Sequence, residues 1–219
     1  MEIHIATVGL TKEPILQGIR AYPVDKLFLL HSNDDESEQN SKNIQEELKP
    51  LGISCELIEV NAYALEDVIL NILEIQKKHP KDNLHINLTG GTKVMASSAL
   101  LAGYILGLNV YYLLDGSIER NKDKTIKELT LELPIPKTSL KELEEVQRKI
   151  ITFIAKEGGK IERANSILNE NLNISKQNAS YHLKQLESKE LISVISTGRN
   201  KDVSLTNTGK LFARMLLKS

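Results

Sequence analysis

The sequence predicts an α/β protein in which a doubly wound, mostly parallel sheet is followed by a smaller domain of helices and a hairpin. Short β-rich runs alternate with amphipathic helical runs through residues 1–133, the pattern of parallel strands joined by crossover helices. The pattern changes after a segment with two prolines, and the charge changes with it. Residues 1–137 carry 14 basic and 20 acidic side chains, whereas residues 138–219 carry 14 basic and 9 acidic ones. These observations indicate an acidic first domain and a basic second domain.

The first domain, residues 1–133, is expected to hold five parallel strands with four helices between them. Because crossover connections between parallel strands are right-handed, this alternation favours a doubly wound topology. A sixth run, Glu128–Leu133, alternates polar and apolar side chains, which fits an antiparallel edge strand with one wet face. The expected strands are Ile3–Val8, Lys26–His31, Ile53–Val60, Leu84–Leu88 and Asn109–Leu114, and the expected helices are Lys12–Arg20, Ser37–Leu48, Ala64–Lys78 and Thr92–Leu106.

Residues 134–139 are the expected linker, because Pro134 and Pro136 end the last strand and stiffen the connection. The second domain, residues 140–219, opens with a capping box of Ser139 and Glu142 ahead of a helix that Gly158-Gly159 ends. The further expected elements are helices over Ile161–Leu172, from Ser175 onward and over Asn207–Leu217, with β-like runs at Leu191–Ser196 and Asp202–Leu205. This order of elements is that of a winged helix-turn-helix domain.

The composition argues against several function classes. Cys55 is the single cysteine, which excludes an intramolecular disulfide and a cysteine-based metal cluster. The five histidines are scattered, so the sequence predicts no metal site, no catalytic residues and no cofactor. Residues 1–9 lack the features of a signal peptide, and polar residues and glycines interrupt the longest apolar stretch, Val94–Leu114. We therefore expect a cytoplasmic protein that makes no membrane contact and is not an enzyme.

The segment Asn87-Leu-Thr-Gly-Gly-Thr-Lys93 is the strongest candidate for a ligand site. It follows a buried strand and opens a helix, so free backbone N–H groups and the positive end of a helix dipole lie at the carboxyl edge of the sheet. Gly90 and Gly91 allow a close approach to the backbone, and Lys93 supplies a positive charge. The candidate anion-binding residues are Asn87, Thr89, Gly90, Gly91, Thr92 and Lys93. The spacing is not that of a Walker A loop, and a plain strand-to-helix turn is the alternative interpretation.

The loop after the first strand is the expected partner of this segment. In an open α/β sheet the ligand crevice lies where the strand order reverses, which places the loops after the first and fourth strands opposite one another. The candidate contacts in the first loop are Thr7, Gly9, Thr11 and Lys12. The loop contains no GxGxxG pattern, which argues against a dinucleotide.

The helix that begins after Ser175 is the candidate DNA-reading helix. Its polar side chains lie opposite an apolar face of Ala179, Leu183 and Leu186, where they can reach phosphates and base edges in a major groove. The candidate DNA contacts are Ser175, Lys176, Gln177, Ser180, Tyr181 and Lys184 on this helix, and Arg199, Asn200 and Lys201 at the tip of the wing. A winged helix used for protein contact is the alternative.

These two features together resemble the CRISPR-associated Rossmann fold (CARF) transcription regulators, in which a Rossmann-like domain precedes a winged helix. Asn87–Lys93 is the specific motif, Thr7–Gly9 supports it, and Ser175–Ile192 with Leu205–Gly209 is similar to multiple-antibiotic-resistance-type winged helices. The resemblance implies a homodimer that binds a cyclic oligoadenylate, the tetramer cyclic tetra-adenylate, across its two-fold axis. It also implies that the ligand tunes the binding of promoter DNA in a CRISPR-Cas system.

Three functions remain open at this point. The first is a ligand-gated DNA-binding regulator, which the resemblance favours. The second is a ring nuclease, since some CARF relatives cleave the cyclic ligand slowly without a metal. The third is a regulator that senses another anionic nucleotide or metabolite in the same crevice.

Overall fold

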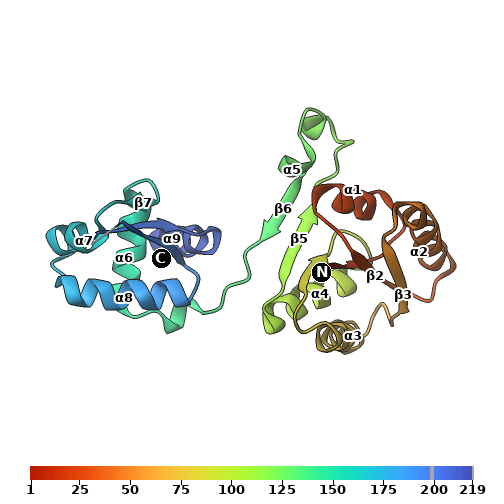
Figure 1. Cartoon of the computed structure of the whole chain (residues 1–219), viewed down its shortest axis with the longest axis horizontal. Helices are drawn as coiled ribbons and strands as arrows, with labels where there is room; N and C mark the ends of the chain where they lie inside the picture. The colour runs from red at the N-terminus through yellow and green to blue at the C-terminus, as the bar shows by residue number, and fades with distance from the viewer. Residues whose placement is uncertain (198–199, 219) are drawn as a thin grey trace. The chain divides into compact units, whose positions relative to one another are not determined.

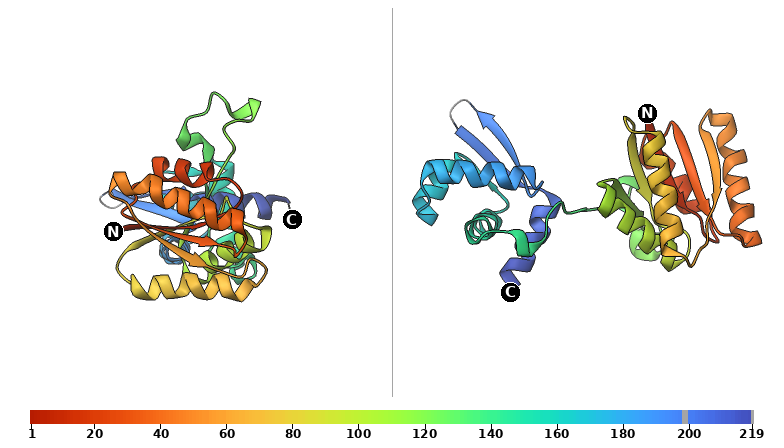
Figure 2. Two further views of the ribbon diagram at one scale, coloured as in Figure 1. Left: turned by 90° about the vertical axis from the view of Figure 1, so that its right-hand side faces the viewer. Right: turned by 90° about the horizontal axis from the view of Figure 1, so that it is seen from below.

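The structure, a computed structural model, describes residues 1–197 and 200–218 (Figures 1 and 2). The chain divides into two compact units, Met1–Ile135 and Pro136–Ser219. The division falls within the expected linker, residues 134–139. Each unit has its own hydrophobic core, so each is described by itself.

A six-stranded sheet in the order β3-β2-β1-β4-β5-β6 forms the centre of the first unit. The strands are β1 (Glu2–Thr7), β2 (Lys26–His31), β3 (Ser54–Glu59), β4 (Asn83–Asn87), β5 (Asn109–Leu113) and β6 (Thr130–Leu133). The first five are parallel, and β6 pairs antiparallel with β5. The predicted doubly wound, mostly parallel α/β sheet is therefore confirmed.

Helices cover both faces of this sheet (Figure 1). They are α1 (Glu13–Ala21), α2 (Asp35–Leu48), α3 (Leu65–Lys78) and α4 (Lys93–Leu106), with a short 3-10 turn at Lys49–Leu51. One core joins Ile3 and Ile5 of β1 to Ile72 of α3 and Met95 of α4. A second core lies on the opposite face, where Leu27 and Leu29 of β2 meet Ile15 of α1 and Ile44 of α2. The alternation of side chains along each strand supplies both cores at once.

The segment between β5 and β6 differs from the prediction. The expected strand Glu128–Leu133 begins only at Thr130, because Ile126–Leu129 forms a short helix, α5, behind a 3-10 turn at Glu119–Asn121. A reciprocal capping box between Thr125 and Glu128 starts α5, and this local signal outweighs the alternating pattern. The segment that carries α5 extends away from the sheet (Figure 1).

The second unit is a winged helix-turn-helix domain. Its helices are α6 (Glu145–Lys156), α7 (Ala164–Leu172), α8 (Lys176–Ser188) and α9 (Asn207–Lys218), and its sheet, in the order β7-β9-β8, consists of β7 (Lys160–Ile161), β8 (Ile192–Thr197) and β9 (Asn200–Leu205). Ile150, Leu168, Leu183 and Phe212, one from each helix, share its core.

Two boundaries in this unit correct the prediction. The helix expected from Leu140 begins at Glu145, because the Ser139 box starts only a 3-10 turn, Leu140–Glu142, and Leu143 is extended. The helix expected from Ile161 begins at Ala164, because Lys160–Ile161 pairs with β9 instead.

Within residues 1–197 and 200–218, no helix has the length and apolar character needed to span a membrane. The same residues contain no group of three or more histidine, cysteine, aspartate or glutamate side chains that could hold a metal ion.

Candidate functional site

The loops after β1 and β4 lie side by side at the carboxyl edge of the sheet. The strand order reverses between these two strands, and Ala6 pairs with Asn87 at their ends. This is the position at which open α/β sheets bind ligands. The first loop spans residues 8–12 and the second spans residues 88–92, and α1 and α4 begin directly after them.

Direct backbone contact joins the two loops. The hydroxyl of Thr7, itself buried, donates to the carbonyl oxygen of Gly90 over 2.7 Å. A Cβ atom on Gly90 would lie less than 3.0 Å from the carbonyl oxygen of Thr7, and one on Gly9 would lie 2.7 Å from the nitrogen of Gly91. Gly90 was predicted to allow a ligand to approach the backbone; it also lets the backbone of the first loop approach, and Gly9 does the same for the second loop.

The threonine hydroxyls of the second loop are also engaged in the protein. Thr89 donates to Oδ1 of Asn87 over 2.7 Å and accepts from the N–H of Leu113 over 2.8 Å. Thr92 donates to the carbonyl oxygen of Ala62 over 2.9 Å and accepts from the N–H of Met95 over 3.1 Å, which makes it the N-cap of α4. These hydroxyls position the loop, so their protons are not available to a ligand in this arrangement.

The N-terminus of α4 is the part of the second loop that remains open to an anion. The N–H groups of Lys93 and Val94 stand at the first two positions of the helix and have no intrahelical acceptor. The side chain of Lys93 is exposed and forms no ion pair with any residue that the structure describes. The helix dipole and the Lys93 ammonium group therefore favour negative charge at the same place.

The remaining candidates, Lys12, Thr11 and Asn87, differ in whether their side chains are already paired within the protein. Lys12 pairs with Glu47 of α2, which raises the pKa of its ammonium group. Thr11 is exposed on the loop. Asn87 accepts from Thr89 and donates Nδ2 to the carbonyl oxygen of Pro14 over 3.3 Å, so it links the second loop to α1.

Two residues of α2 that were not predicted hold the first loop from its other side. Ser37 donates to the carbonyl oxygen of Val8 over 3.2 Å, and Asn40 donates Nδ2 to that of Gly9 over 3.1 Å. Asp34 caps α2 by accepting from the N–H of Ser37. The Ser32 hydroxyl and this N–H lower the pKa of the Asp34 carboxyl. The acidic run that begins at Asp34 is typical of a helix start, and it could have indicated that the first turns of α2 lie beside the first loop.

A buried polar layer lies between the sheet and α1. Nδ1 of His4 lies 2.8 Å from the hydroxyl oxygen of Tyr111, and the His4 ring stacks on His85 at 4.9 Å between centroids. Burial, with a smaller contribution from His85, lowers the pKa of His4 to about 4. Burial also raises the pKa of the Tyr111 phenol. His4 is therefore neutral near pH 7.

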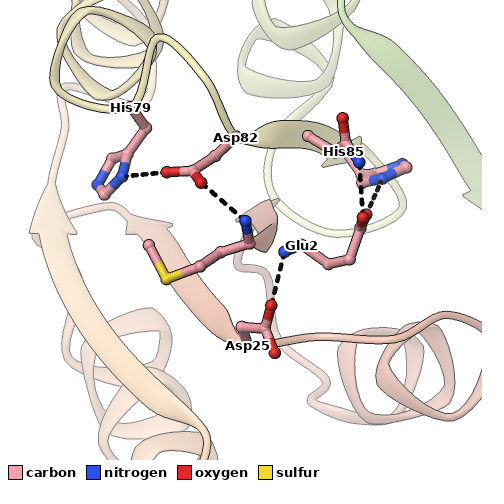
Figure 3. A network of polar contacts seen from close by, with 7 residues as sticks. Glu2, Asp25, His79, Asp82 and His85 are labelled. Carbon is pink, nitrogen blue, oxygen red and sulfur yellow. Dashed lines mark hydrogen bonds and ion pairs between the residues drawn. The ribbon is translucent and has the colours of Figure 1, made fainter.

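A second polar network closes the opposite, amino edge of the sheet (Figure 3). Glu2 accepts from Asn83 over 2.6 Å and lies 2.9 Å from Nε2 of His85, and these two contacts lower the pKa of its carboxyl. The backbone N–H of Glu2 donates to Asp25 over 2.7 Å. This network connects the amino ends of β1 and β4, so its groups serve the sheet rather than the crevice.

In the second unit, α8 presents the predicted polar face. Ala179, Leu183 and Leu186 are buried, while Lys176, Gln177, Tyr181 and Lys184 are exposed. Ser175 is the N-cap of α8 and accepts from the N–H of Asn178 over 3.2 Å.

The wing contacts α8 through Lys201, whose Nζ donates to Oγ of Ser180 over 3.0 Å. This contact brings together one predicted residue from each element. The backbone of Asn200 begins β9, and Arg199 lies outside the described residues.

Comparisons with solved structures give the fold. Csm6 of Enterococcus italicus, bound to cyclic hexa-2'-fluoro-hexa-dAMP, is 12% identical with a TM-score of 0.52, over all of this chain and 53% of Csm6. Can2 of Sulfobacillus thermosulfidooxidans, in complex with cyclic tetra-adenylate, is 14% identical with a TM-score of 0.49, over all of this chain and 65% of Can2. The chain thus spans between half and two thirds of these proteins. The predicted resemblance, a CARF-type domain followed by a winged helix, is confirmed at the level of fold.

Sequence comparison gives the family. An uncharacterized protein of Archaeoglobus fulgidus is 22% identical over an alignment of 228 positions that covers 97% of each chain. The model of the DUF6293 C-terminal winged helix domain matches residues 137–217. The model described as HFX_2341-like, N-terminal matches residues 2–117, more than half of the chain, and the protein therefore belongs to the HFX_2341-like family.

Proposed function

We propose that this protein is a CRISPR-associated regulator that senses a cyclic oligoadenylate with its first unit and binds DNA with its second. The observation that carries the proposal is the pair of joined loops at the strand-order reversal, which leaves the N-terminus of α4 and Lys93 open to a phosphate. The fold likeness to Csm6, whose solved structure holds a cyclic oligonucleotide, supports a ligand of this class. We propose cyclic tetra-adenylate as the physiological ring on the basis of the CARF resemblance.

A cyclic ligand with several phosphates favours two copies of the site. One chain supplies one α4 N-terminus and one Lys93, whereas a homodimer with two-fold symmetry would present the same loop twice to a symmetric ring. The outer face of α4 supports such a dimer. Leu100, Leu101, Tyr104 and Ile105 recur at helical spacing and are 38–60% exposed. A contiguous apolar face of this kind marks an interaction surface, for which we propose a second copy of the chain.

The exposed face of α8 supports the DNA-binding part of the proposal. Lys176 and Lys184 are exposed on it, and residues 138–219 carry a net charge of +5. Basic side chains on the second helix of a helix-turn-helix contact phosphates and base edges in the major groove. A homodimer would then read two half-sites of a promoter.

Ligand binding changes DNA affinity only when the ligand binds two arrangements of the dimer with different affinity. The segment between the two units contains Pro134 and Pro136, which restrict its backbone. Replacing both with glycine should weaken the coupling between ligand and DNA. Equal coupling in the glycine variant and the wild type would argue against this role.

The direct test is a calorimetric titration of the full chain with cyclic tetra-adenylate. We expect one ligand bound per two chains. Lys93→Ala should weaken this binding, while Lys12→Ala, which removes a lysine already paired with Glu47, should change it far less. A chain that binds AMP but no cyclic oligoadenylate would instead be a sensor of mononucleotides.

We propose a sensor rather than a ring nuclease. The hydroxyl protons of Thr7, Thr89 and Thr92 are all donated to protein acceptors, so these groups contribute to the shape of the loops rather than to chemistry. Chromatography of the titrated sample should recover the ring intact. Linear products that accumulate in the absence of a metal would establish the nuclease instead.

A further inference from the structure

Tyr63 is the most exposed large apolar or aromatic side chain of the described residues, with 79% of its surface accessible. It lies in the loop between β3 and α3, residues 60–64, which was not predicted to contribute to the site. A tyrosine usually buries much of its ring, so an exposure of this size calls for a reason.

The loop that carries Tyr63 is fixed by its own hydrogen bonds. Oδ1 of Asn61 accepts from the N–H of Tyr63 over 3.1 Å, and the carbonyl oxygen of Asn61 accepts from the N–H of Ala64 over 3.0 Å. The N–H of Asn61 donates in turn to Oδ2 of Asp67 over 2.6 Å, which anchors the turn to α3. These hydrogen bonds fix the backbone that carries Tyr63, whose side chain remains exposed.

The same loop lies directly against the candidate ligand site. The hydroxyl of Thr92, the N-cap of α4, donates to the carbonyl oxygen of Ala62 over 2.9 Å. Tyr63 follows Ala62 in the chain, and Lys93 follows Thr92. This hydrogen bond joins the residue before Tyr63 to the residue before Lys93, and both of the following side chains are exposed.

We propose that Tyr63 is a stacking platform for a nucleobase of the ligand whose phosphate lies at the N-terminus of α4. This inference rests on the proposed function and extends it from the phosphate to the base. An aromatic ring stacks on any base through its π-face, and loss of one such contact weakens binding about 5- to 150-fold. With such a platform, an anion site made of backbone N–H groups would prefer a nucleotide to inorganic phosphate.

The chain contains no tryptophan, which allows a direct optical test. Tyr63→Trp creates a single tryptophan, which can be excited selectively, on the proposed platform. Leu51→Trp is its matched control, because Leu51 is 68% exposed in the 3-10 turn that precedes β3, at the opposite edge of the sheet. Both full-length variants are titrated with cyclic tetra-adenylate, and calorimetry compares the wild type with Tyr63→Ala and Tyr63→Phe.

We expect the ligand to quench the tryptophan fluorescence of Tyr63→Trp in a saturable way and to leave that of Leu51→Trp unchanged. Tyr63→Ala should bind at least about fivefold more weakly, while Tyr63→Phe, which keeps the ring, should stay within about twofold of the wild type. Suppose that the wild type binds cyclic tetra-adenylate, that Tyr63→Ala binds it equally well, and that the tryptophan fluorescence of Tyr63→Trp is not quenched. The stacking platform is then wrong, and the proposed ligand stands. If the wild type does not bind cyclic tetra-adenylate at all, the proposed function fails, and the platform with it.

Discussion

The side-chain hydroxyl of Thr7 donates a 2.7 Å hydrogen bond to the carbonyl oxygen of Gly90, across 83 positions of the chain. Thr7 is buried, so a valine in its place would keep the shape and leave the Gly90 carbonyl without its donor. We expect Thr7→Val to lower the free energy of unfolding by about 1–3 kcal/mol, the cost of an unsatisfied buried polar group. Urea unfolding of the full chain measures this change. Thr7→Ser keeps the donor and is the control; equal losses in both variants would exclude the hydrogen bond as the cause.

A methyl group at Gly90 should separate the two loops. Because its Cβ atom would meet the backbone carbonyl of Thr7, which cannot turn away, we expect Gly90→Ala to lower the free energy of unfolding by about 1–3 kcal/mol. Binding of cyclic tetra-adenylate should weaken as well, since both loops border the proposed site. Gly116→Ala is the matched control, because its Cβ atom would meet only the end of the flexible Leu129 side chain. The two variants should differ in thermal and urea unfolding; similar values would contradict the close contact.

His4 should make the first unit less stable in mild acid. Its pKa is about 4 in the folded chain and about 6.5 when unfolded, so the unfolded chain binds more protons between these values. The contribution of neutral His4 is therefore fully present above pH 6.5 and declines as the pH falls towards 4. Between pH 6.5 and pH 5 we expect a loss of about 2 kcal/mol in the free energy of unfolding.

The double variant His4→Phe/Tyr111→Phe tests this assignment. It removes the titrating ring together with its hydroxyl partner, so neither member of this pair is left facing the other without a partner. Urea unfolding at pH 6.5 and pH 5 should show a much smaller difference than in the wild type. The window lies above the usual pKa of carboxyl groups, and the pKa of Glu2 is lower still, so this neighbouring carboxyl does not obscure it. An unchanged difference would assign the pH dependence to another group.

DNA affinity should depend on salt through the exposed lysines of α8. Each phosphate contact contributes about 0.9 to the slope of log affinity against log salt concentration, so Lys176→Ala and Lys184→Ala should each reduce the slope by about that amount. Lys149→Ala is the control, because this exposed lysine lies on α6 and pairs with Glu145. Fluorescence anisotropy with duplex DNA at several salt concentrations measures the slopes. A slope that the α8 variants leave unchanged would favour a winged helix that binds protein instead.

The sequence contained enough information for the sheet and for the neighbourhood of the two loops. Right-handed crossovers and the run of β-rich segments place β1 beside β4, and the Gly-Gly pair marks the turn into α4. The acceptor of the Thr92 hydroxyl could not be predicted, because Ala62 lies 30 residues away and meets Thr92 only once the sheet is folded. Tyr63 was not predicted as a site residue for the same reason, since its exposure is a property of the tertiary structure.

Two predicted boundaries, the starts of α6 and β6, are wrong because a second capping signal lies close to each. The Ser139 capping box is present, but Glu144 and Gln147 form another box, and the regular helix starts there. The alternation in Glu128–Leu133 suggested a longer strand, but the box of Thr125 and Glu128 turns the first residues into α5.

The hydroxyl protons of Thr7, Thr89 and Thr92 are donated to acceptors within the protein, so the groups left for an anion are mainly peptide N–H groups. Every residue except proline supplies such a group, and selection on the bound anion therefore acts weakly on side-chain identity at these positions. Gly9 and Gly90 are different, because any larger residue would force the loops apart. Over long divergence we expect such a crevice to keep its glycines while most of its side chains drift, which would leave related sensors hard to recognise by their residues alone.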